Sequence, residues 1–233
     1  MQNIEKKQNG LFIMLEGTDG SGKTTQTELL VKKLKEEGHD VEQISFPQYG
    51  EKSAALVEDY LNGKFGTAEE VGPYRASILY AVDRYAAKEK IEKWLAAGKI
   101  VIANRYVASN MGHQGGKIAD TEERQKYFDW NYNLEYTIFE IPRPDVNIIL
   151  HVTPEISQQL VDKKEAREYI TDGKTRDIHE DDLNHLKNAE RAYLDIANQF
   201  QEFTLIECVE ENSMLPADTI HTKIWETISP HLS

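Results

Sequence analysis

The feature that most constrains this chain is its glycine-rich stretch, Gly17-Thr18-Asp19-Gly20-Ser21-Gly22-Lys23-Thr24-Thr25, which fits the pattern G-x-x-x-x-G-K-[ST]. The apolar run 11–15 before it is long enough for a buried strand, and a helical pattern follows it. Glycines let successive main-chain N–H groups surround a phosphate at a helix N-terminus. We expect Lys23 to reach the β- and γ-phosphates of a nucleotide and the Thr24 hydroxyl to bind Mg²⁺. The alternative is an ordinary glycine-rich turn.

Composition limits the partners that the chain can have. The 233 residues predict one α/β domain, and the net charge of −13 argues against a general nucleic-acid or anionic-membrane binder. Cys208 is the only cysteine, which excludes an internal disulfide and fits a reducing cytoplasm. No apolar run approaches the ~20 residues of a membrane span. Residues 1–9 are polar and are predicted to form a flexible tail, with the domain covering residues 10–233.

Strands and helices are predicted to alternate along the chain. After the first strand we expect strands at 40–46, 99–103, 146–152 and 203–208. Helices are expected after the glycine-rich stretch, at 53–61, from Pro73 to Gly98, and at 121–139, 154–164, 181–201 and 218–228. This alternation predicts a five-stranded parallel sheet with helices on both faces, a three-layer α/β sandwich whose ligands bind at the carboxyl ends of the strands.

Chemically useful side chains follow the second and third strands. The second strand leads into Phe46-Pro47-Gln48-Tyr49-Gly50, which is either a ligand loop or a plain turn. The third leads into the segment 104–115, where Arg105 suits bidentate phosphate binding, with a salt bridge at the rim as the alternative. Tyr80 and Arg84 share a helix face at i and i+4 and suit a planar base; the alternative is a core tyrosine beside a surface arginine.

A polar, charged segment from 165 to about 179 lacks apolar periodicity and is expected to be a lid loop. It carries Arg167 and Arg176 and is followed by Glu180. Closing over a nucleotide, it would bring an arginine to the transferring phosphoryl group and exclude water; the alternative is a solvated loop. Asp83 is expected to pair with a nearby cation. The histidines at 151, 185 and 221 have no metal-ligand spacing and are expected to be structural.

Over residues 11–230 the chain resembles the thymidylate kinases, P-loop enzymes that phosphorylate dTMP with ATP. Five ordered segments carry the resemblance: Glu16 to Thr25, Phe46 to Gly50, Tyr80 to Arg84, Asn104 to Asn110, and Ile141-Pro142-Arg143-Pro144-Asp145. The glycine-rich stretch alone is shared by many NTPases, whereas the ordered set is far more specific.

The resemblance implies roles for individual residues. It implies ATP binding by residues 17–25 and catalysis by Lys23, Arg105 and a lid arginine, Arg167 or Arg176. It implies Mg²⁺ held near Thr24, Asp19 and Glu180. It implies that Tyr80 stacks on thymine, Arg84 hydrogen-bonds the base, Asn110 helps to read it and Arg105 holds the dTMP phosphate. Asp19, Phe46, Tyr49, His113 and Gln114 complete the implied acceptor site. A homodimer is also implied.

Three residues depart from the family pattern. Asn104 stands where the family has Asp, Gln48 where many relatives have Arg, and His113 where close relatives often have Tyr. Under one interpretation, the absence of the Asp and the Arg is compensatory, because losing both keeps the local charge unchanged. Under the other, it signals altered acceptor choice or weakened catalysis. Two alternatives to a dTMP kinase follow: a P-loop kinase for another deoxynucleotide or deoxynucleoside, and a nucleotide-binding regulatory protein.

Overall fold

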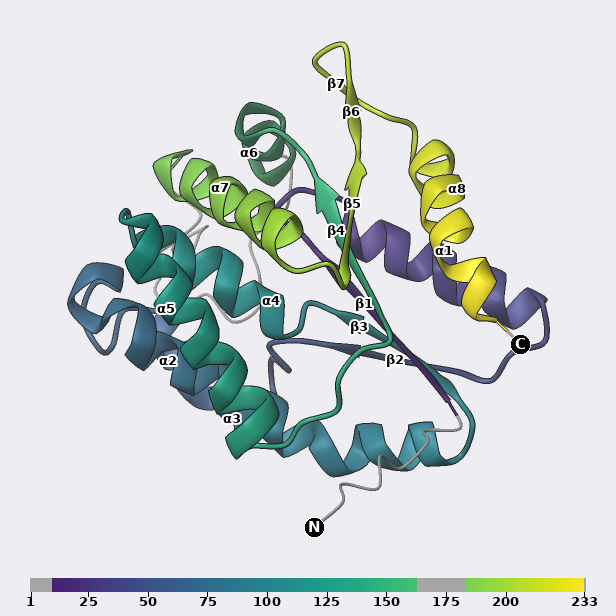
Figure 1. Ribbon diagram of the computed structural model, residues 1–233, viewed down its shortest axis with the longest axis horizontal. Coiled ribbons are helices and arrows are strands. Elements are labelled where there is room, and N and C mark those ends of the chain that lie inside the picture. Colours follow the sequence, from purple (N-terminus) through teal and green to yellow (C-terminus); the bar gives the residue numbers. More distant parts are fainter. Residues whose placement is uncertain (1–9, 163–182, 233) are drawn as a thin grey trace.

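The computed structural model describes residues 10–162 and 183–232, and a five-stranded parallel sheet lies at its centre (Figure 1). The strands are β1 (Leu11–Glu16), β2 (Val41–Ser45), β3 (Ile100–Asn104), β4 (Val146–His151) and β5 (Phe203–Glu207). Their order is β2-β3-β1-β4-β5, and Leu15 lies beside Asn104 in the register. The predicted sheet is therefore confirmed, and the ends of β1 and β3 are neighbours at the edge where ligands bind.

Helices cover both faces of the sheet (Figure 1). They are α1 (Lys23–Glu36), α2 (Ala55–Leu61), α3 (Ala68–Ala96), α4 (Val107–Ser109), α5 (Thr121–Tyr132), α6 (Pro154–Asp162), α7 (Leu183–Gln199) and α8 (Ala217–Ile228). Short 3₁₀ turns lie at Lys52–Ala54, Gly115–Lys117 and Ser229–His231, and π-helical turns at Asn110–Gln114 and Asn133–Ile138.

The alternating side chains of the strands separate two hydrophobic cores. Phe12 and Met14 of β1 pack with α3, α5 and α7, whereas Ile13 and Leu15 pack with α1 and α8. This is the period-two alternation of a strand buried on both faces. A smaller third cluster joins α2 to the first half of α3. Among the described residues, no helix is both long and apolar enough to cross a bilayer.

Two helices differ from their predicted extents. The helix expected from Pro73 begins at Ala68, where Thr67 and Glu70 form a capping box; Gly72, at φ 73°, then interrupts it, and Pro73 starts its longer part. The helix expected over 121–139 has α-helical geometry only to Tyr132 and continues as the π-helical turn. Single-turn π segments are rare and have no strong sequence signature, which explains the second difference.

A short hairpin of β6 (Val209–Glu210) and β7 (Ser213–Met214) was not predicted. Its turn residues Glu211 and Asn212 both have positive φ, as a two-residue type I′ turn requires. Glu-Asn lacks the glycine that usually marks such turns, so the pattern was hidden. Other boundaries agree to within a few residues. The predicted tail at 1–9 and the predicted lid lie outside the described residues.

Candidate active site

The loop between β1 and α1 forms a cradle at the carboxyl end of the sheet. Gly22 is the N-cap of α1 in the left-handed region (φ 85°) and offers no side-chain cap to the first helical N–H groups. A Cβ on Gly20 would lie 2.5 Å from the Ser157 carbonyl oxygen, so no side chain fits there. The result is a ring of main-chain donors at a helix N-terminus, where negative charge is favoured.

Lys23 supplies the cation of this cradle and is almost fully buried. Its Nζ donates hydrogen bonds to the carbonyl oxygens of Gly17 (3.0 Å) and Thr18 (2.7 Å) and to Ser21 Oγ (3.3 Å). The ammonium group is therefore held against the loop itself. Thr18 and Ser21 lie behind the loop rather than on its open side, so they shape it and do not line the adjacent cavity.

A cavity of about 820 Å³ opens from the cradle. Six of the nine loop residues line it, from Asp19 to Thr25 with the exception of Ser21. The ends of β2 and β3 close one side, and Met214, Leu215, Ala217 and Ile220 form an apolar wall on another. The hairpin that the sequence did not predict thus supplies part of this wall, which suits a flat apolar ring such as a nucleobase.

A second, smaller cavity of about 60 Å³ adjoins the first. All nine residues predicted for acceptor binding line it: Asp19, Phe46, Tyr49, Tyr80, Arg84, Arg105, Asn110, His113 and Gln114. Five residues line both cavities: Asp19, Phe46, Pro47, Tyr49 and Arg105. The two cavities therefore meet end to end, with a carboxylate and a guanidinium at the junction.

Arg105 is held at this junction by both its backbone and its side chain. Its φ of 68° lies in the left-handed region, which costs a non-glycine residue on the order of 1–3 kcal/mol. Its Nη2 pairs with Asp19 Oδ1 at 2.6 Å, and its Nη1 lies 2.9 Å from His113 Nε2 and 3.4 Å from Ser109 Oγ. The rim salt bridge considered as an alternative role is therefore present, and it lies where the cavities join.

Glu16 stabilises the strained turn, and sequence reasoning assigned it no role. It is fully buried, and its Oε1 accepts hydrogen bonds from the backbone N–H groups of Tyr106 (2.6 Å) and Ser109 (3.0 Å). Its Oε2 accepts from the hydroxyls of Ser109 (2.7 Å) and Tyr193 (3.1 Å). A glutamate at the end of an otherwise apolar strand was the available signal, because a buried carboxylate needs several donors.

Arg84 is buried rather than exposed, so the alternative of a surface arginine is wrong. It is 2% exposed, and Glu135 is 0% exposed. Arg84 Nε and Nη2 donate to the two oxygens of Glu135, each at 2.5 Å, in a bidentate pair. Burial alone would lower the pKa of Arg84, but the Glu135 carboxylate outweighs it and raises that pKa above its ordinary value.

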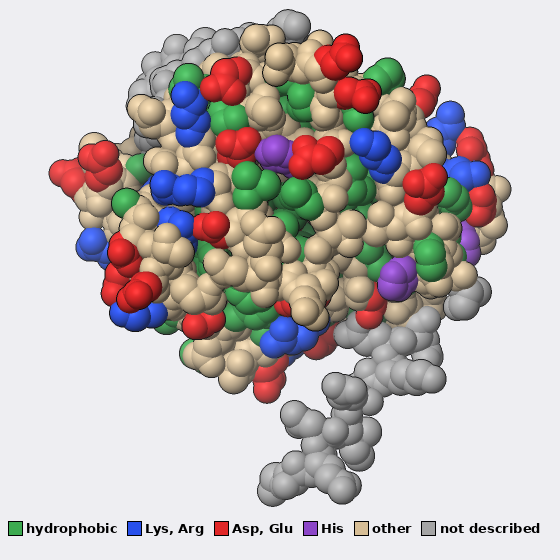
Figure 2. Space-filling view, turned by 45° about the horizontal axis from the view of Figure 1, so that its top comes forward, with side chains coloured by type: hydrophobic (Ala, Val, Ile, Leu, Met, Phe, Trp, Pro, Cys, Tyr) green, Lys and Arg blue, Asp and Glu red, His purple; other side chains and the backbone are tan. Residues whose placement is uncertain are grey.

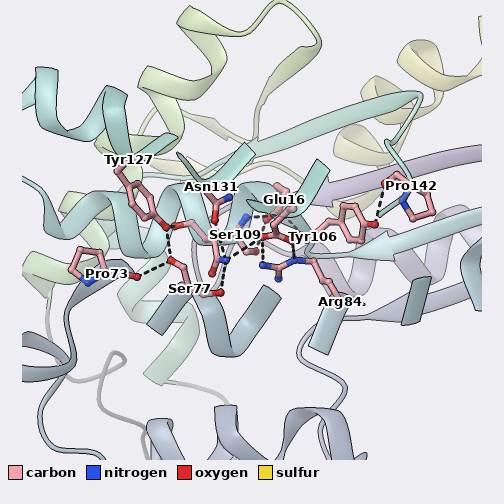
Figure 3. Close-up of polar contacts among 11 residues, drawn as sticks. Glu16, Pro73, Ser77, Arg84, Tyr106, Ser109, Tyr127, Asn131 and Pro142 are labelled. Carbon is pink, nitrogen blue, oxygen red and sulfur yellow. Dashed lines mark hydrogen bonds and ion pairs between the residues drawn. The ribbon is translucent and has the colours of Figure 1, made fainter. Parts of the chain in front are cut away.

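A wider buried network surrounds this pair, and Figure 3 shows Arg84 with Ser77, Tyr127 and Asn131 of that network. Asn110 joins the pair to it. Its Nδ2 donates to Ser77 O (3.1 Å), Glu135 Oε1 (3.2 Å) and Asn131 Oδ1 (3.3 Å). Tyr127 Oη contacts Ser77 Oγ at 2.6 Å and donates to the Asn110 carbonyl. Asn110 and Glu135 both come from π-helical turns, which aim their side chains inward.

Gln114 has a defined amide orientation because of Lys117. The Lys117 Nζ lies 2.7 Å from Gln114 Oε1 and 2.9 Å from Tyr60 Oη. An ammonium group only donates, so the amide oxygen faces Lys117 and the amide nitrogen is left for the cavity. Burial lowers the pKa of Lys117 to about 8. Tyr80 lies nearby, edge to face with Tyr60 at a centroid distance of 6.2 Å.

Two of the residues that depart from the family pattern, Gln48 and Asn104, have defined contacts in the structure. Gln48 donates through its backbone N–H and its Nε2 to the Asp83 carboxylate, at 2.8 and 3.1 Å. Ser53 Oγ donates to the same carboxylate at 2.5 Å, so the hydrogen bonds that Asp83 accepts within the described residues come from uncharged groups, and a cation partner for it stays a prediction. Asn104 Nδ2 lies 3.5 Å from Thr24 Oγ1, and its buried Oδ1 has no hydrogen-bond partner among the described residues.

Arg167 and Arg176 of the predicted lid, and Glu180 after it, lie outside the described residues. Of the three histidines expected to be structural, His151 and His185 have side-chain partners, whereas the buried Nδ1 of His221 has no hydrogen-bond partner among the described residues. His151 lies between Glu207 (2.6 Å) and Glu190 (2.9 Å); burial opposes its charge, but these carboxylates raise its pKa. His185 contacts His113 beside the site. Within residues 10–162 and 183–232, no cluster of three or more His, Cys, Asp or Glu residues forms a metal site.

Comparison with known proteins agrees with this geometry. The family profile described as "Thymidylate kinase" matches residues 15–217. "Thymidylate kinase" of Mycobacterium tuberculosis is 28% identical over 81% of this chain and 86% of its own length. The Caldanaerobacter subterraneus enzyme of the same name is 30% identical over 87% of this chain and 89% of its own. The solved structure of thymidylate kinase from Candida albicans shares the fold, with a TM-score of 0.73 at 21% identity over 95% of this chain and 92% of its own.

Proposed function

This chain belongs to the thymidylate kinase family and is an ATP-dependent kinase of dTMP, and on that premise we propose that its larger cavity binds ATP and its smaller cavity dTMP. The observation that carries the proposal is the shared border of the two cavities, where Arg105 lies. Two nucleotides bound end to end would place their phosphates on either side of this guanidinium. Such placement supplies most of the catalysis in phosphoryl transfer.

The polar groups of the smaller cavity match thymine in kind and number. Arg84 uses Nε and Nη2 on Glu135, which leaves Nη1 as a donor for the cavity. Asn110 uses Nδ2 within the protein, which leaves Oδ1 as an acceptor, and Gln114 offers its Nε2 as a donor. Two donors and one acceptor complement the O4, O2 and N3–H of thymine. Cytosine presents an amino group in place of O4 and would leave a buried donor unpaired.

Tyr80 completes the proposed base site as an aromatic surface. It lines the smaller cavity from α3, one helical turn before Arg84, and Tyr60 packs edge to face against it. The packing restricts the tilt of the ring, so that its face is prepared for a planar base. Stacking of a base on an aromatic ring contributes about 1–3 kcal/mol.

The proposed reaction needs no strong general base, because a phosphate monoester is largely ionised near neutral pH. An oxygen of the dTMP phosphate forms a bond to the γ-phosphorus of ATP. The bond from that phosphorus to the bridging oxygen breaks, and ADP leaves with the electron pair. Lys23, Arg105 and main-chain N–H groups of the loop neutralise the moving charge, and we propose that a lid arginine, Arg167 or Arg176, does so as well.

The chemistry of the loop fits the Mg²⁺ that phosphoryl transfer to dTMP requires. Thr24 lines the larger cavity. Asn104 contacts Thr24 through its Nδ2, and its buried Oδ1 has no hydrogen-bond partner within the part of the chain that the structure describes. Mg²⁺ prefers oxygen ligands and takes most of them from phosphates and water in such sites. We propose Thr24 as its protein ligand, with Glu180 as a further candidate; Asp19 already pairs with Arg105. When bound, Mg²⁺ would supply positive charge that offsets the charge of the phosphates.

Helix α3 offers a surface for a homodimer. Tyr74, Ile78, Val82 and Tyr85 are all exposed and recur at helical spacing, which predicts an apolar stripe. We propose that a second copy covers it. On the face seen in Figure 2, basic side chains are interspersed with acidic ones, which together with the net charge supports small nucleotides, and not nucleic acid or a membrane, as ligands. The single cysteine supports a cytoplasmic location.

An acceptor panel tests the proposed function. Release of ADP from ATP would be measured with dTMP, dUMP, dCMP and thymidine as acceptors, with and without Mg²⁺. We expect dTMP to give the highest kcat/KM and dCMP the lowest of the three nucleotides. Tight ATP binding without acceptor-dependent ADP release would contradict kinase activity, and a preference for thymidine over dTMP would contradict the proposed phosphate site at Arg105.

A further inference from the structure

Two histidines continue the hydrogen-bond chain that begins at Arg105. Arg105 Nη1 lies 2.9 Å from His113 Nε2, and His113 Nδ1 lies 3.2 Å from His185 Nε2. The two imidazole rings are stacked, with centroids 5.5 Å apart and an angle of 18° between their planes. One of these histidines replaces the tyrosine often found at position 113, and the other was expected to be merely structural.

The donors and acceptors of this chain follow from the arginine. A guanidinium only donates, so His113 Nε2 must accept and carry no proton. The proton of neutral His113 is then on Nδ1, which donates to His185 Nε2. His185 Nε2 is likewise unprotonated, and its proton is on Nδ1. The contacts thus assign both histidines as neutral Nδ1–H tautomers.

Backbone packing fixes the distance between the two histidines. His113 lies in the π-helical turn Asn110–Gln114, and His185 lies in the first turn of α7. A Cβ on Gly112 would lie 2.5 Å from the ring of Tyr193, and one on Gly116 would lie 2.8 Å from the backbone of Asn188. Glycines at these positions therefore let α7 approach the turn that carries His113 closely.

The guanidinium of Arg105 is thus held from two sides of different charge. Asp19 accepts from Nη2 as a carboxylate, whereas His113 accepts from Nη1 as a neutral ring. A neutral acceptor orients the guanidinium without cancelling its charge, which remains available to a phosphate. We propose that the His113–His185 pair positions Arg105 for the acceptor phosphate; this rests on the proposed function.

The groups around the pair favour its neutral form. Burial and then Arg105 lower the pKa of His113 well below its ordinary value, and His185 and Lys23 act in the same direction. Asp19 opposes them. Tyr193 faces the His113 ring at a centroid distance of 5.8 Å, and burial raises the pKa of its hydroxyl, so it stays neutral. A proton added to His113 would make its Nε2 a donor that faces the Arg105 guanidinium, and a proton added to His185 Nε2 would face the Nδ1–H of His113.

Two substitutions of His113 separate positioning from packing. In His113→Gln the Oε1 reaches the place of Nε2 and accepts from Arg105, whereas in His113→Asn the shorter amide reaches only toward His185. We expect the KM for dTMP to rise at least about tenfold in His113→Asn, because a hydrogen bond to a charged group contributes about 1.5–3 kcal/mol. We expect a rise of only about threefold in His113→Gln, and a KM for ATP within about twofold of wild type in both variants.

Equal KM values for dTMP in the two variants would overturn the positioning role, as would equal losses for dTMP and ATP. If the wild type releases no ADP with dTMP, the proposed function fails; if it turns over and the variants do not differ, only the present inference fails. The acid limb of kcat/KM should be shallower in His113→Gln than in wild type. The dTMP phosphate itself ionises with a pKa of about 6, but this affects the wild type and His113→Gln equally. It therefore cancels when the kcat/KM of the variant is divided by that of the wild type at each pH.

A direct measurement complements the kinetics. Nitrogen-15 NMR of the imidazole rings in the intact wild-type protein reports the tautomer of each histidine, with His113→Gln and His185→Gln as assignment controls. We expect His113 and His185 both to be Nδ1–H tautomers at pH 7.5. An Nε2–H tautomer at His113 would place two donors face to face and would overturn the proposal.

Discussion

The proposed ATP side and the proposed dTMP side of this site are built by different means. The cradle proposed for ATP comes from one continuous stretch, Gly17–Thr25, and relies on main-chain N–H groups and one lysine. The cavity proposed for dTMP is assembled from side chains that are far apart in sequence, as the pair Arg84–Glu135 and the contact between Asp19 and Arg105 illustrate. A local motif specifies the first region, whereas only the folded chain creates the second.

This difference predicts how each region fails. Removing a group from the cradle should abolish chemistry and leave the fold intact, because few tertiary contacts depend on it. Removing a group from the buried network beneath the cavity proposed for dTMP should weaken the fold and acceptor binding together. The remaining partner would then be a buried charge that neither water nor an opposite charge stabilises. The following substitutions test the contrast, in order of decreasing effect.

Lys23→Ala tests the cradle. We expect kcat to fall about a thousandfold, because the lysine neutralises charge on the phosphoryl group only during transfer, while the Tm changes little. Lys32→Ala is the matched control, since Lys32 lies on the same helix, exposed, in a 3.9 Å pair with Glu36. A Lys23→Ala enzyme within tenfold of wild type would contradict the assignment of the larger cavity to ATP.

Glu135→Gln tests the buried network. It leaves the Arg84 charge without its partner, so we expect a loss of about 3–5 kcal/mol in the free energy of unfolding. For a chain of this size the Tm should fall on the order of 10 °C. Glu140→Gln is the control, because Glu140 is exposed and pairs loosely with Lys88 at 3.5 Å. Equal melting temperatures for the two variants would mean that the buried pair does not hold the cavity together.

Tyr80→Ala tests the base surface without removing a charge. Loss of stacking should raise the KM for dTMP about tenfold, corresponding to about 1–3 kcal/mol, and leave the KM for ATP unchanged. Tyr80→Phe keeps the ring and should retain most of the affinity. If the alanine variant binds dTMP as well as the phenylalanine variant, the base does not lie on Tyr80.

The pH dependence of stability is the smallest expected effect. The pKa of folded His113 is below its unfolded value of about 6.5, so the unfolded chain takes up the proton first. The contribution of His113 is therefore complete above about pH 6.5 and is lost as the pH falls below it, by up to about 1.4 kcal/mol per pH unit. Chemical denaturation at pH 7.5 and 5.5 should show a smaller loss in His113→Gln than in wild type; equal losses would contradict the neutral assignment.

The parts of the site that sequence reasoning could reach were those with local signals. The glycine pattern, the alternation of strands and helices, and Arg105 at a strand end all follow from short-range spacing. Glu135 was not found because it lies in a π-helical turn within what reads as an ordinary helix. Glu16 was recognised only as part of a motif, since its four hydrogen bonds come from segments about 90 and 177 positions away.

The buried state of Arg84 shows the same limit. Helical spacing placed it beside Tyr80, but spacing alone left a surface position open, because burial depends on the distant carboxylate that neutralises it. His185 was set aside for want of metal-ligand spacing, although its contact with His113 is a property of tertiary packing between α7 and the turn at 110–114.

A crystal structure with dTMP and a non-hydrolysable ATP analogue tests the central claim most directly. We predict thymine against Tyr80 and Arg84, the dTMP phosphate hydrogen-bonded to Arg105, and the γ-phosphate analogue across from it in the Gly17–Thr25 cradle. Thymine bound against Met214 and Leu215 in the larger cavity, or phosphates separated by more than the reach of Arg105, would contradict the end-to-end arrangement.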